Sequence, residues 1–267
     1  MTLSMLNLNI LSKIFKKDPT RTKTVRDQYA RKMKKLMRWY GKEAKKGLAQ
    51  YRTYAGLPTP FQMDLQDYTD YITGLTGSLL EQGQAIIEDT MPRVYDAGGD
   101  FANVVVGKFS GVPGAMGAVD PRAIAAINTA NLSAWDGISQ ETKKQILREI
   151  SDGMRLGEGM TRITKRIDDR VKHIGMVRTD FMCRTEVVRA FNIGAEDRYK
   201  QYGSKKLIWI AAIGDERTCD DCEARSGDIF DISSSHIRPP LHVNCRCSVA
   251  PADDIDREEI EFIKSRK

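Results

Sequence analysis

The chain's apolar residues recur three or four positions apart over most of its length. In residues 22–40 this pattern is carried by Val25, Tyr29, Met33, Leu36 and Tyr40. The spacing lines up one face of a helix, so it predicts an amphipathic helix. Basic residues lie mostly elsewhere on the helical circle, at Lys32, Lys34, Lys35 and Arg38. The segment is therefore predicted to be a basic amphipathic helix.

Local signals divide the middle of the chain into further helices. The two prolines of AGLPTPFQ, residues 55–62, predict a break, because proline lacks a donor and restricts the residue before it. Residues 77–99 are again helical in pattern, and a glycine-rich connection follows. Asp120 as N-cap and Pro121 as first helical residue then predict a helix from Pro121 to about Leu132.

Three more helical segments follow in the second half of the chain. Ser139 is a suitable N-cap for a helix that Gly157 would end. A short helix is predicted over residues 161–171. The longest helix is predicted to begin at Val177 and to end before Gly203, which is placed as a C-terminal cap.

The segment after this helix changes from helix formers to β-favouring residues. Leu207, Trp209 and Ala211 alternate with Ile208 and Ile210, which predicts a strand. The first cysteine pair follows this predicted strand in the sequence. The sequence therefore predicts an α+β protein that is mainly α-helical, with a small C-terminal β-hairpin module.

The composition is that of an ordinary soluble protein that can bury a core, with 41% hydrophobic and 29% charged residues. The chain has no apolar run long enough for a transmembrane helix. Its first residues, MTLSMLNLNILSKIF, lack the basic start and the cleavage site of a signal peptide. We therefore expect a reducing compartment, where clustered cysteines are more often metal ligands than disulfides.

Charge is distributed unevenly along a chain whose formal net charge is +6. Residues 1–56 hold fifteen Lys or Arg and three acidic residues, whereas residues 57–130 hold three and nine. Residues 1–56 are therefore predicted to be a basic helical arm that can contact DNA, an anionic membrane or an acidic protein. A solvated helix face is an equally simple interpretation. A protein partner is favoured, because the helix has more apolar surface than phosphate contacts need.

Four of the five cysteines gather near the C-terminus. Cys219 and Cys222 form a Cys-x-x-Cys pair, whose spacing lets two thiolates reach one metal ion at about 2.3 Å. His242, Cys245 and Cys247 follow about twenty residues later. These five residues predict a structural zinc site, in which zinc takes four protein ligands. We expect Cys219, Cys222 and His242 as ligands, with either Cys245 or Cys247 as the fourth.

Three other interpretations of this cluster are open. A redox Cys-x-x-Cys needs a thioredoxin-like pattern and would leave the downstream His-x-x-Cys-x-Cys unexplained. Without a metal, the cysteines would be small buried hydrophobic residues. A catalytic zinc would keep one position open for water, whereas these residues can fill all four. His173 and His236 stand apart from the cluster, and surface or core positions are expected for both.

Catalytic motifs are missing from the sequence, which contains no phosphate loop, no HExxH and no Ser-His-Asp order. We therefore expect no enzymatic activity, and no residue is assigned a catalytic role. Arg184 interrupts the apolar stripe of the longest predicted helix, and Glu186 follows two residues later. These two side chains either support the zinc module from that helix or form surface ion pairs.

The order of motifs from about Trp135 to Pro251 is specific. An Arg-Thr-Glu helix motif precedes a tryptophan, Asp-x-x-Thr-Cys-x-x-Cys, a glycine-led hairpin and Pro-Pro-x-His-x-x-Cys-Arg-Cys. The residues concerned are Arg184, Thr185, Glu186, Asn192, Trp209, Asp215, Thr218, Cys219, Cys222, Gly227, Pro239, Pro240, His242, Cys245, Arg246 and Cys247. In these features the chain resembles the phage Mu F-like minor head proteins, a head morphogenesis family. The N-terminal half shows no matching motif.

This resemblance implies a structural protein of the virion, in the phage head interior or at the portal vertex, made in the host cytoplasm during assembly. The implied partners are the portal protein or the major capsid protein, and the basic arm is a candidate contact for packaged DNA. The implied role is in head assembly, DNA packaging or delivery, without a small-molecule substrate. Because few residues follow Pro251, we expect no appended enzyme domain.

Two other functions fit the sequence. The first alternative is a zinc-stabilised nucleic-acid-binding protein, and the second is a nuclease or transferase in the helical half.

Five regions are predicted along the chain. They are a basic helical N-terminal arm (1–56), a helical region (57–134), the helical part of the Mu F-like region (135–205), a zinc-clamped Cys/His β-module (206–251) and a charged C-terminal tail (252–267).

Overall fold

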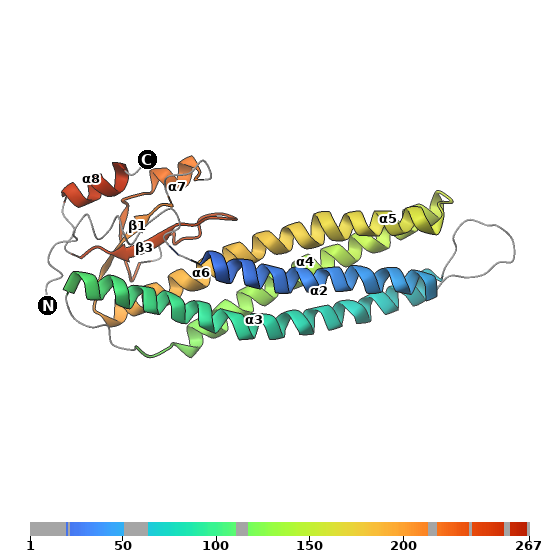
Figure 1. Ribbon diagram of the computed structural model, residues 1–267, viewed down its shortest axis with the longest axis horizontal. Helices are drawn as coiled ribbons and strands as arrows, with labels where there is room; N and C mark the ends of the chain where they lie inside the picture. Colours follow the sequence, from blue (N-terminus) through green and yellow to red (C-terminus); the bar gives the residue numbers. More distant parts are fainter. Residues whose placement is uncertain are drawn as a thin grey trace. The chain divides into compact units, whose positions relative to one another are not determined.

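The computed structural model describes residues 20, 22–50, 64–110, 117–212, 218–234, 237–253 and 257–265. Its helices are α2 (Lys23–Gln50), α3 (Leu65–Ser110), α4 (Pro121–Arg155), α5 (Met160–Arg170), the π-helix η1 (Val171–Met176), α6 (Val177–Gln201), α7 (Asp220–Ala224) and α8 (Arg257–Ser265), as Figure 1 shows. Its strands are β1 (Lys206–Ile210), β2 (Ile229–Asp231) and β3 (Ser248–Pro251). The described chain is therefore mainly helical with a small sheet, as the sequence predicts. None of the described helices combines the length and the hydropathy of a membrane span.

The chain divides into two compact units. The helical unit comprises residues 28–89 and 128–183, and the sheet-containing unit comprises residues 1–27, 90–127 and 184–267. Helices α2, α3, α4 and α6 each contribute residues to both units. The two units are described separately below.

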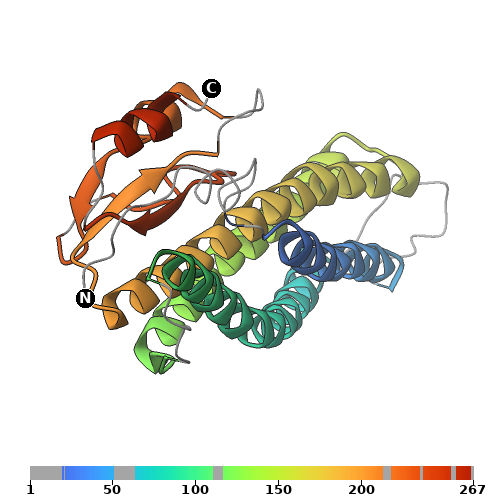
Figure 2. The same ribbon diagram turned by 60° about the vertical axis from the view of Figure 1, so that its left-hand side comes forward.

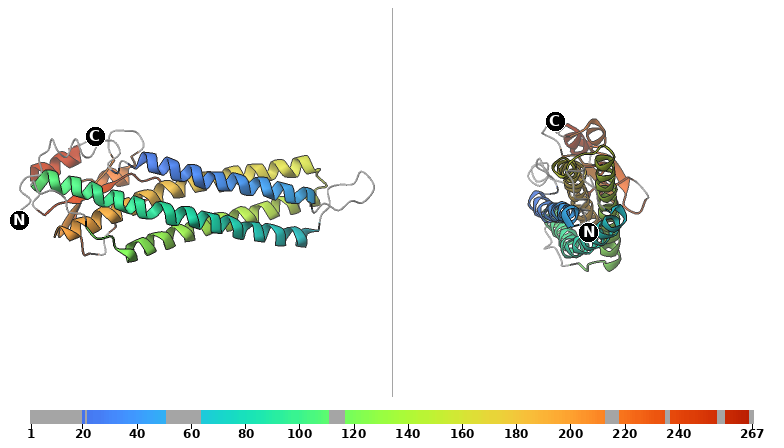
Figure 3. Two further views of the ribbon diagram at one scale, coloured as in Figure 1. Left: turned by 60° about the horizontal axis from the view of Figure 1, so that its bottom comes forward. Right: turned by 90° about the vertical axis from the view of Figure 1, so that its right-hand side faces the viewer.

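In the helical unit, segments of α2, α3, α4 and α5 run roughly along one direction (Figures 1 and 3). The apolar face of α2 is buried, with Tyr29, Met33 and Tyr40 almost without exposed surface. The Tyr40 hydroxyl lies 2.9 Å from the Thr76 hydroxyl, and the Tyr68 hydroxyl donates to the Ala44 carbonyl at 2.9 Å. The predicted basic helix is thus confirmed, and its apolar stripe forms part of the core of its own chain.

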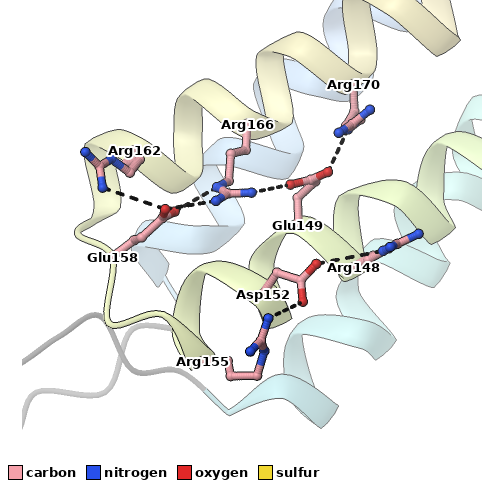
Figure 4. Close-up of polar contacts among 8 residues, drawn as sticks. All are labelled: Arg148, Glu149, Asp152, Arg155, Glu158, Arg162, Arg166 and Arg170. Carbon is pink, nitrogen blue, oxygen red and sulfur yellow. Dashed lines mark hydrogen bonds and ion pairs between the residues drawn. The ribbon is translucent and has the colours of Figure 1, made fainter.

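An acid–base cluster joins α4 to α5 in the helical unit (Figure 4). The guanidinium of Arg166 donates to both carboxylate oxygens of Glu158 at 2.7 and 2.9 Å, and to Glu149 at 2.8 Å. Arg170 donates to the second oxygen of Glu149 at 2.7 Å. Burial alone would raise the pKa of the Glu149 carboxyl, but hydrogen bonds from Arg166 and Arg170 lower it below its ordinary value of 4.5. The cluster therefore holds a nearly buried carboxylate in its charged form.

We expect Arg166→Met to lower the urea concentration at the midpoint of unfolding, because it leaves Glu149 with one cation fewer in a nearly buried position. The matched control is Arg155→Met, since Arg155 is exposed and pairs with Asp152 at 3.6 Å. Surface changes of that kind stay within about 0.5 kcal/mol. Because the Glu149 pKa is lowered on folding, the stabilisation is present above pH 4.5 and is lost as the pH falls further. Equal midpoints for both variants at pH 7 would contradict this account.

The sheet-containing unit holds a three-stranded antiparallel sheet in the order β2-β1-β3. Leu207 of β1 is opposite Phe230 of β2 and Pro251 of β3. Figure 2 shows these strands, in orange and red, together with α8. The C-terminal part of the predicted charged tail thus forms α8, whose Ile263 carbonyl accepts a hydrogen bond from the Ser226 hydroxyl at 3.4 Å. We refer to the described residues of 206–253 as the Cys module.

Several local signals act as the sequence predicts. The Asp120 side chain accepts a hydrogen bond from the Arg122 amide at 2.8 Å, so Asp120 caps α4. Gly157 and Gly203 have positive φ angles of 67° and 83°, the left-handed conformation that ends a helix. The predicted strand is present as β1.

The predicted division between residues 132 and 139 is wrong. One continuous helix, α4, runs from Pro121 to Arg155. The Ser139 hydroxyl does not cap a helix but donates to the Trp135 carbonyl one turn earlier, at 2.8 Å. Trp135 is fully buried in the helical unit, and its indole donates to the Leu79 carbonyl at 3.3 Å. Packing of this side chain therefore overrides the local capping signal.

The backbone also remains helical from Met160 to Gln201, through α5, η1 and α6, where two separate helices are predicted. The break at residues 55–62, the start of the glycine-rich connection and the N-terminal apolar segment lie outside the described residues.

Candidate metal centre

Two tight turns present four of the five predicted ligands, and Cys247 follows the second turn. Cys219 precedes α7, and its carbonyl accepts hydrogen bonds from the amides of Cys222 and Glu223, each at 3.0 Å. The second turn is closed by the Cys245 amide, which donates to the His242 carbonyl at 3.1 Å. Asn244 occupies the left-handed position of this turn with φ 64°, a conformation that asparagine tolerates. Each turn therefore directs two candidate ligands toward the same place.

The side chains from the two turns meet. His242 Nε2 lies 3.1 Å from the sulfur atoms of both Cys219 and Cys222. The Cys222 sulfur lies 3.7 Å from the Cys245 sulfur. Cys219, Cys222 and His242 form one group of ligand atoms within 4.8 Å of one another, and Cys222, Cys245 and Cys247 form a second. All five predicted residues are thus brought together, and Cys222 belongs to both groups.

The spacing and chemistry of these atoms suit zinc. Two sulfur atoms bound at about 2.3 Å to a tetrahedral ion are about 3.8 Å apart, close to the separation of Cys222 and Cys245. A cavity of about 10 Å³ lies among these side chains, with room for no more than a small group. His242 Nδ1 lies 2.8 Å from the Val243 carbonyl, so the proton belongs on Nδ1 and the Nε2 lone pair faces the thiols.

The buried part of the cluster favours a negative charge. The pKa of the Cys245 thiol is lowered, because Cys222 and Cys247 donate hydrogen bonds to its thiolate. The pKa of Cys222 is raised, chiefly because its proton is held in the hydrogen bond to Cys245. A bound dication would compensate these charges and allow further thiols to lose their protons. The donor set therefore fits a thiolate-binding metal ion.

Helix α6 supports the second ligand turn and the residues that follow it. The Asn192 side-chain amide donates to the Cys247 carbonyl at 3.0 Å, and its oxygen accepts from the Ser248 hydroxyl at 2.8 Å. The Thr185 hydroxyl accepts from the Asn244 amide at 3.2 Å. Asn192 and Thr185 belong to the motif pattern, but no role was predicted for either residue. Ser248 was not singled out, because no local signal marks a contact across 56 residues.

The other residues considered from the sequence fall elsewhere. Glu186 is nearly buried, which raises its pKa, and it pairs with Arg189 of the same helix at 3.1 Å. Arg184 is exposed on α6. His173 is exposed in η1 and belongs to the helical unit. Asp215 and His236 lie outside the described residues.

Comparison with known proteins assigns this region to a family. Residues 144–250 match the family model described as Phage Mu protein F like protein. A similar protein, the uncharacterized protein MJ0329 of Methanocaldococcus jannaschii, is 25% identical over 122 residues, which cover 45% of this chain and 19% of that protein. This chain thus spans about a fifth of the length of that relative. No solved structure matches the chain.

The matched region contains all five candidate ligands and the α6 residues that bond to Asn244 and Cys247. This region of the chain is thus similar to the Phage Mu protein F-like family, a family of phage head morphogenesis proteins.

Proposed function

We propose that this chain is a structural protein of the phage head that binds the portal protein or the major capsid protein. Its role is in head assembly, DNA packaging or delivery, at the portal vertex or on the inner capsid. One observation carries the proposal: the region that matches the family holds a compact set of candidate metal ligands, presented mainly by two tight turns. A closed site of this kind stabilises a surface and leaves no position for a reacting water. A structural role also agrees with the family, which is not known as enzymatic.

The metal in this proposal is one structural zinc ion. Cys219, Cys222, His242 and Cys245 are its ligands, and Cys247 donates a hydrogen bond from the buried side. The 3.7 Å separation of Cys222 and Cys245 supports Cys245 as the fourth ligand. The lowered pKa of the Cys245 thiol supports the same choice, because zinc binds the thiolate form of cysteine. Zinc would then tie the two ligand turns together beside α6.

The alternative function, a zinc-stabilised nucleic-acid-binding protein, is less well supported. The helix that follows Cys219 carries Asp220, Asp221 and Glu223 in its first turn. Three carboxylates beside the metal would repel phosphate groups. This part of the Cys module is therefore better suited to a protein partner than to a nucleic acid.

The test is co-purification of the tagged chain with the portal protein and with the major capsid protein of the same phage. We expect the wild-type chain to retain one of these two proteins. The Cys222→Ser variant should retain at least ten-fold less of it, because the zinc site has lost one ligand. Cys183→Ser is the matched control, because Cys183 is buried in the helical unit, apart from the cluster. Retention of neither protein by the wild-type chain would contradict the proposed role.

A further inference from the structure

The structure changes the choice of partner for the basic helix α2. A protein groove for its apolar face was the favoured expectation from the sequence. That face is already covered within the helical unit, where Met33, Met37 and Tyr40 have no exposed surface. The part of α2 that remains for a partner is therefore its polar face.

The lysines on the two sides of α2 are occupied within the helical unit. They form ion pairs with carboxylates of α3, α6 and α5. The pairs are Lys32 with Asp89 at 3.3 Å, Lys34 with Asp180 at 2.6 Å, and Lys45 with Asp168 at 2.6 Å. These lysines attach α2 to its neighbours, so their charge is largely neutralised.

The face opposite the buried one carries a line of exposed cations, which we call the outward cationic stripe: Arg31, Lys35, Arg38 and Lys42. Their steps of four, three and four residues keep them on one side of the helix over about 16 Å. Within the described part of the chain, no carboxylate forms an ion pair with Lys35, Arg38 or Lys42. Lys35, Arg38 and Lys42 thus form an exposed positive surface that carboxylates of the described residues do not neutralise.

The chemistry of this face favours a polyanion over a protein. Among the described residues of α2, no large apolar side chain is exposed. A stable protein interface usually has an apolar or aromatic core, whereas binding to a phosphate backbone needs only spaced cations. Duplex DNA carries one negative charge per about 1.7 Å of axis, so about 16 Å of duplex presents roughly ten phosphates. Each cation of the stripe can therefore reach a phosphate within the length that this part of the helix covers.

We propose that the outward cationic stripe of α2 binds the phosphate backbone of duplex DNA, without reading base sequence. This inference goes beyond the proposed head-assembly role. It concerns the helical unit and not the metal centre, and its test uses no other phage protein. A failure of one proposal therefore leaves the other standing.

The test is a titration of the full-length chain against a random 20-base-pair duplex, followed by fluorescence anisotropy. With three phosphate contacts, affinity should fall about 40-fold between 50 and 200 mM salt. The variant K35Q/R38Q/K42Q should reduce the slope of log affinity against log salt by about 2.7. The control K144Q/R148Q/K165Q removes the same charge from exposed cations of α4 and α5 and should change the slope by less than one unit. Circular dichroism checks that both variants keep the helical content of the wild type.

Two outcomes would overturn the proposal. Equal slopes for the two triple variants would mean that net charge, and not this stripe, determines binding. Competition by polyglutamate as strong as that by duplex DNA, at equal charge concentration, would instead assign the stripe to an acidic protein surface.

Discussion

Replacement of Cys222 by serine should unfold the Cys module and leave most of the helical signal in place. The strands of this module are five, three and four residues long, and a sheet of that size is marginal without further support. A structural zinc site contributes on the order of 10 kcal/mol of apparent binding free energy. Cys222 belongs to both groups of candidate ligands, so its loss weakens both groups.

The measurement for this variant is amide hydrogen exchange, with circular dichroism to follow the helices. We expect lost protection over residues 206–253 in Cys222→Ser, and in the wild-type chain after treatment with a strong zinc chelator. Cys183→Ser should keep that protection, because Cys183 lies outside the cluster. Full protection of the module in chelated wild-type protein would refute a stabilising metal.

Asn192→Leu should weaken both the fold and the metal site. Asn192 is nearly buried, and leucine has a similar volume but forms none of its hydrogen bonds. The Ser248 hydroxyl and the Cys247 carbonyl would each lose the partner they have at 2.8 and 3.0 Å. A buried polar group left without a partner costs about 1–3 kcal/mol, so we expect a loss of about 2–4 kcal/mol in the free energy of unfolding. Loss of a group that orients a ligand typically lowers metal affinity 10–100-fold.

Urea unfolding and competition with a zinc-binding dye measure these two effects of Asn192→Leu. Gln201→Leu is the matched control, since this exposed amide of α6 donates to the Ala118 carbonyl at 2.9 Å. It should change stability by less than about 0.5 kcal/mol and should leave zinc affinity unchanged. An unchanged zinc affinity in Asn192→Leu would limit Asn192 to a role in packing.

Local patterns in the sequence predict where the helices lie, but they do not predict which helices pack against one another. The apolar spacing of α2 identifies its buried face, but only the fold shows that the helical unit itself covers that face. The error at Ser139 has the same origin, since the burial of Trp135 against another helix is invisible in a local capping motif. Tertiary contacts decide such cases because they outweigh differences in local propensity.

The candidate metal centre was more predictable than the contacts around it. Cysteine and histidine at short spacings identify all five ligand candidates, because the tight turns that join them are local. The supporting bonds from Thr185 and Asn192 connect residues 55 or more positions apart. No periodicity or spacing rule predicts such pairs from one sequence.

Zinc-edge X-ray absorption on the purified, unmodified protein tests the central claim of a zinc-clamped head protein most directly. The account predicts about one zinc ion per chain, with three sulfur neighbours at about 2.3 Å and one nitrogen at about 2.0 Å. Folded protein that contains no metal, or zinc bound by oxygen atoms alone, would contradict it.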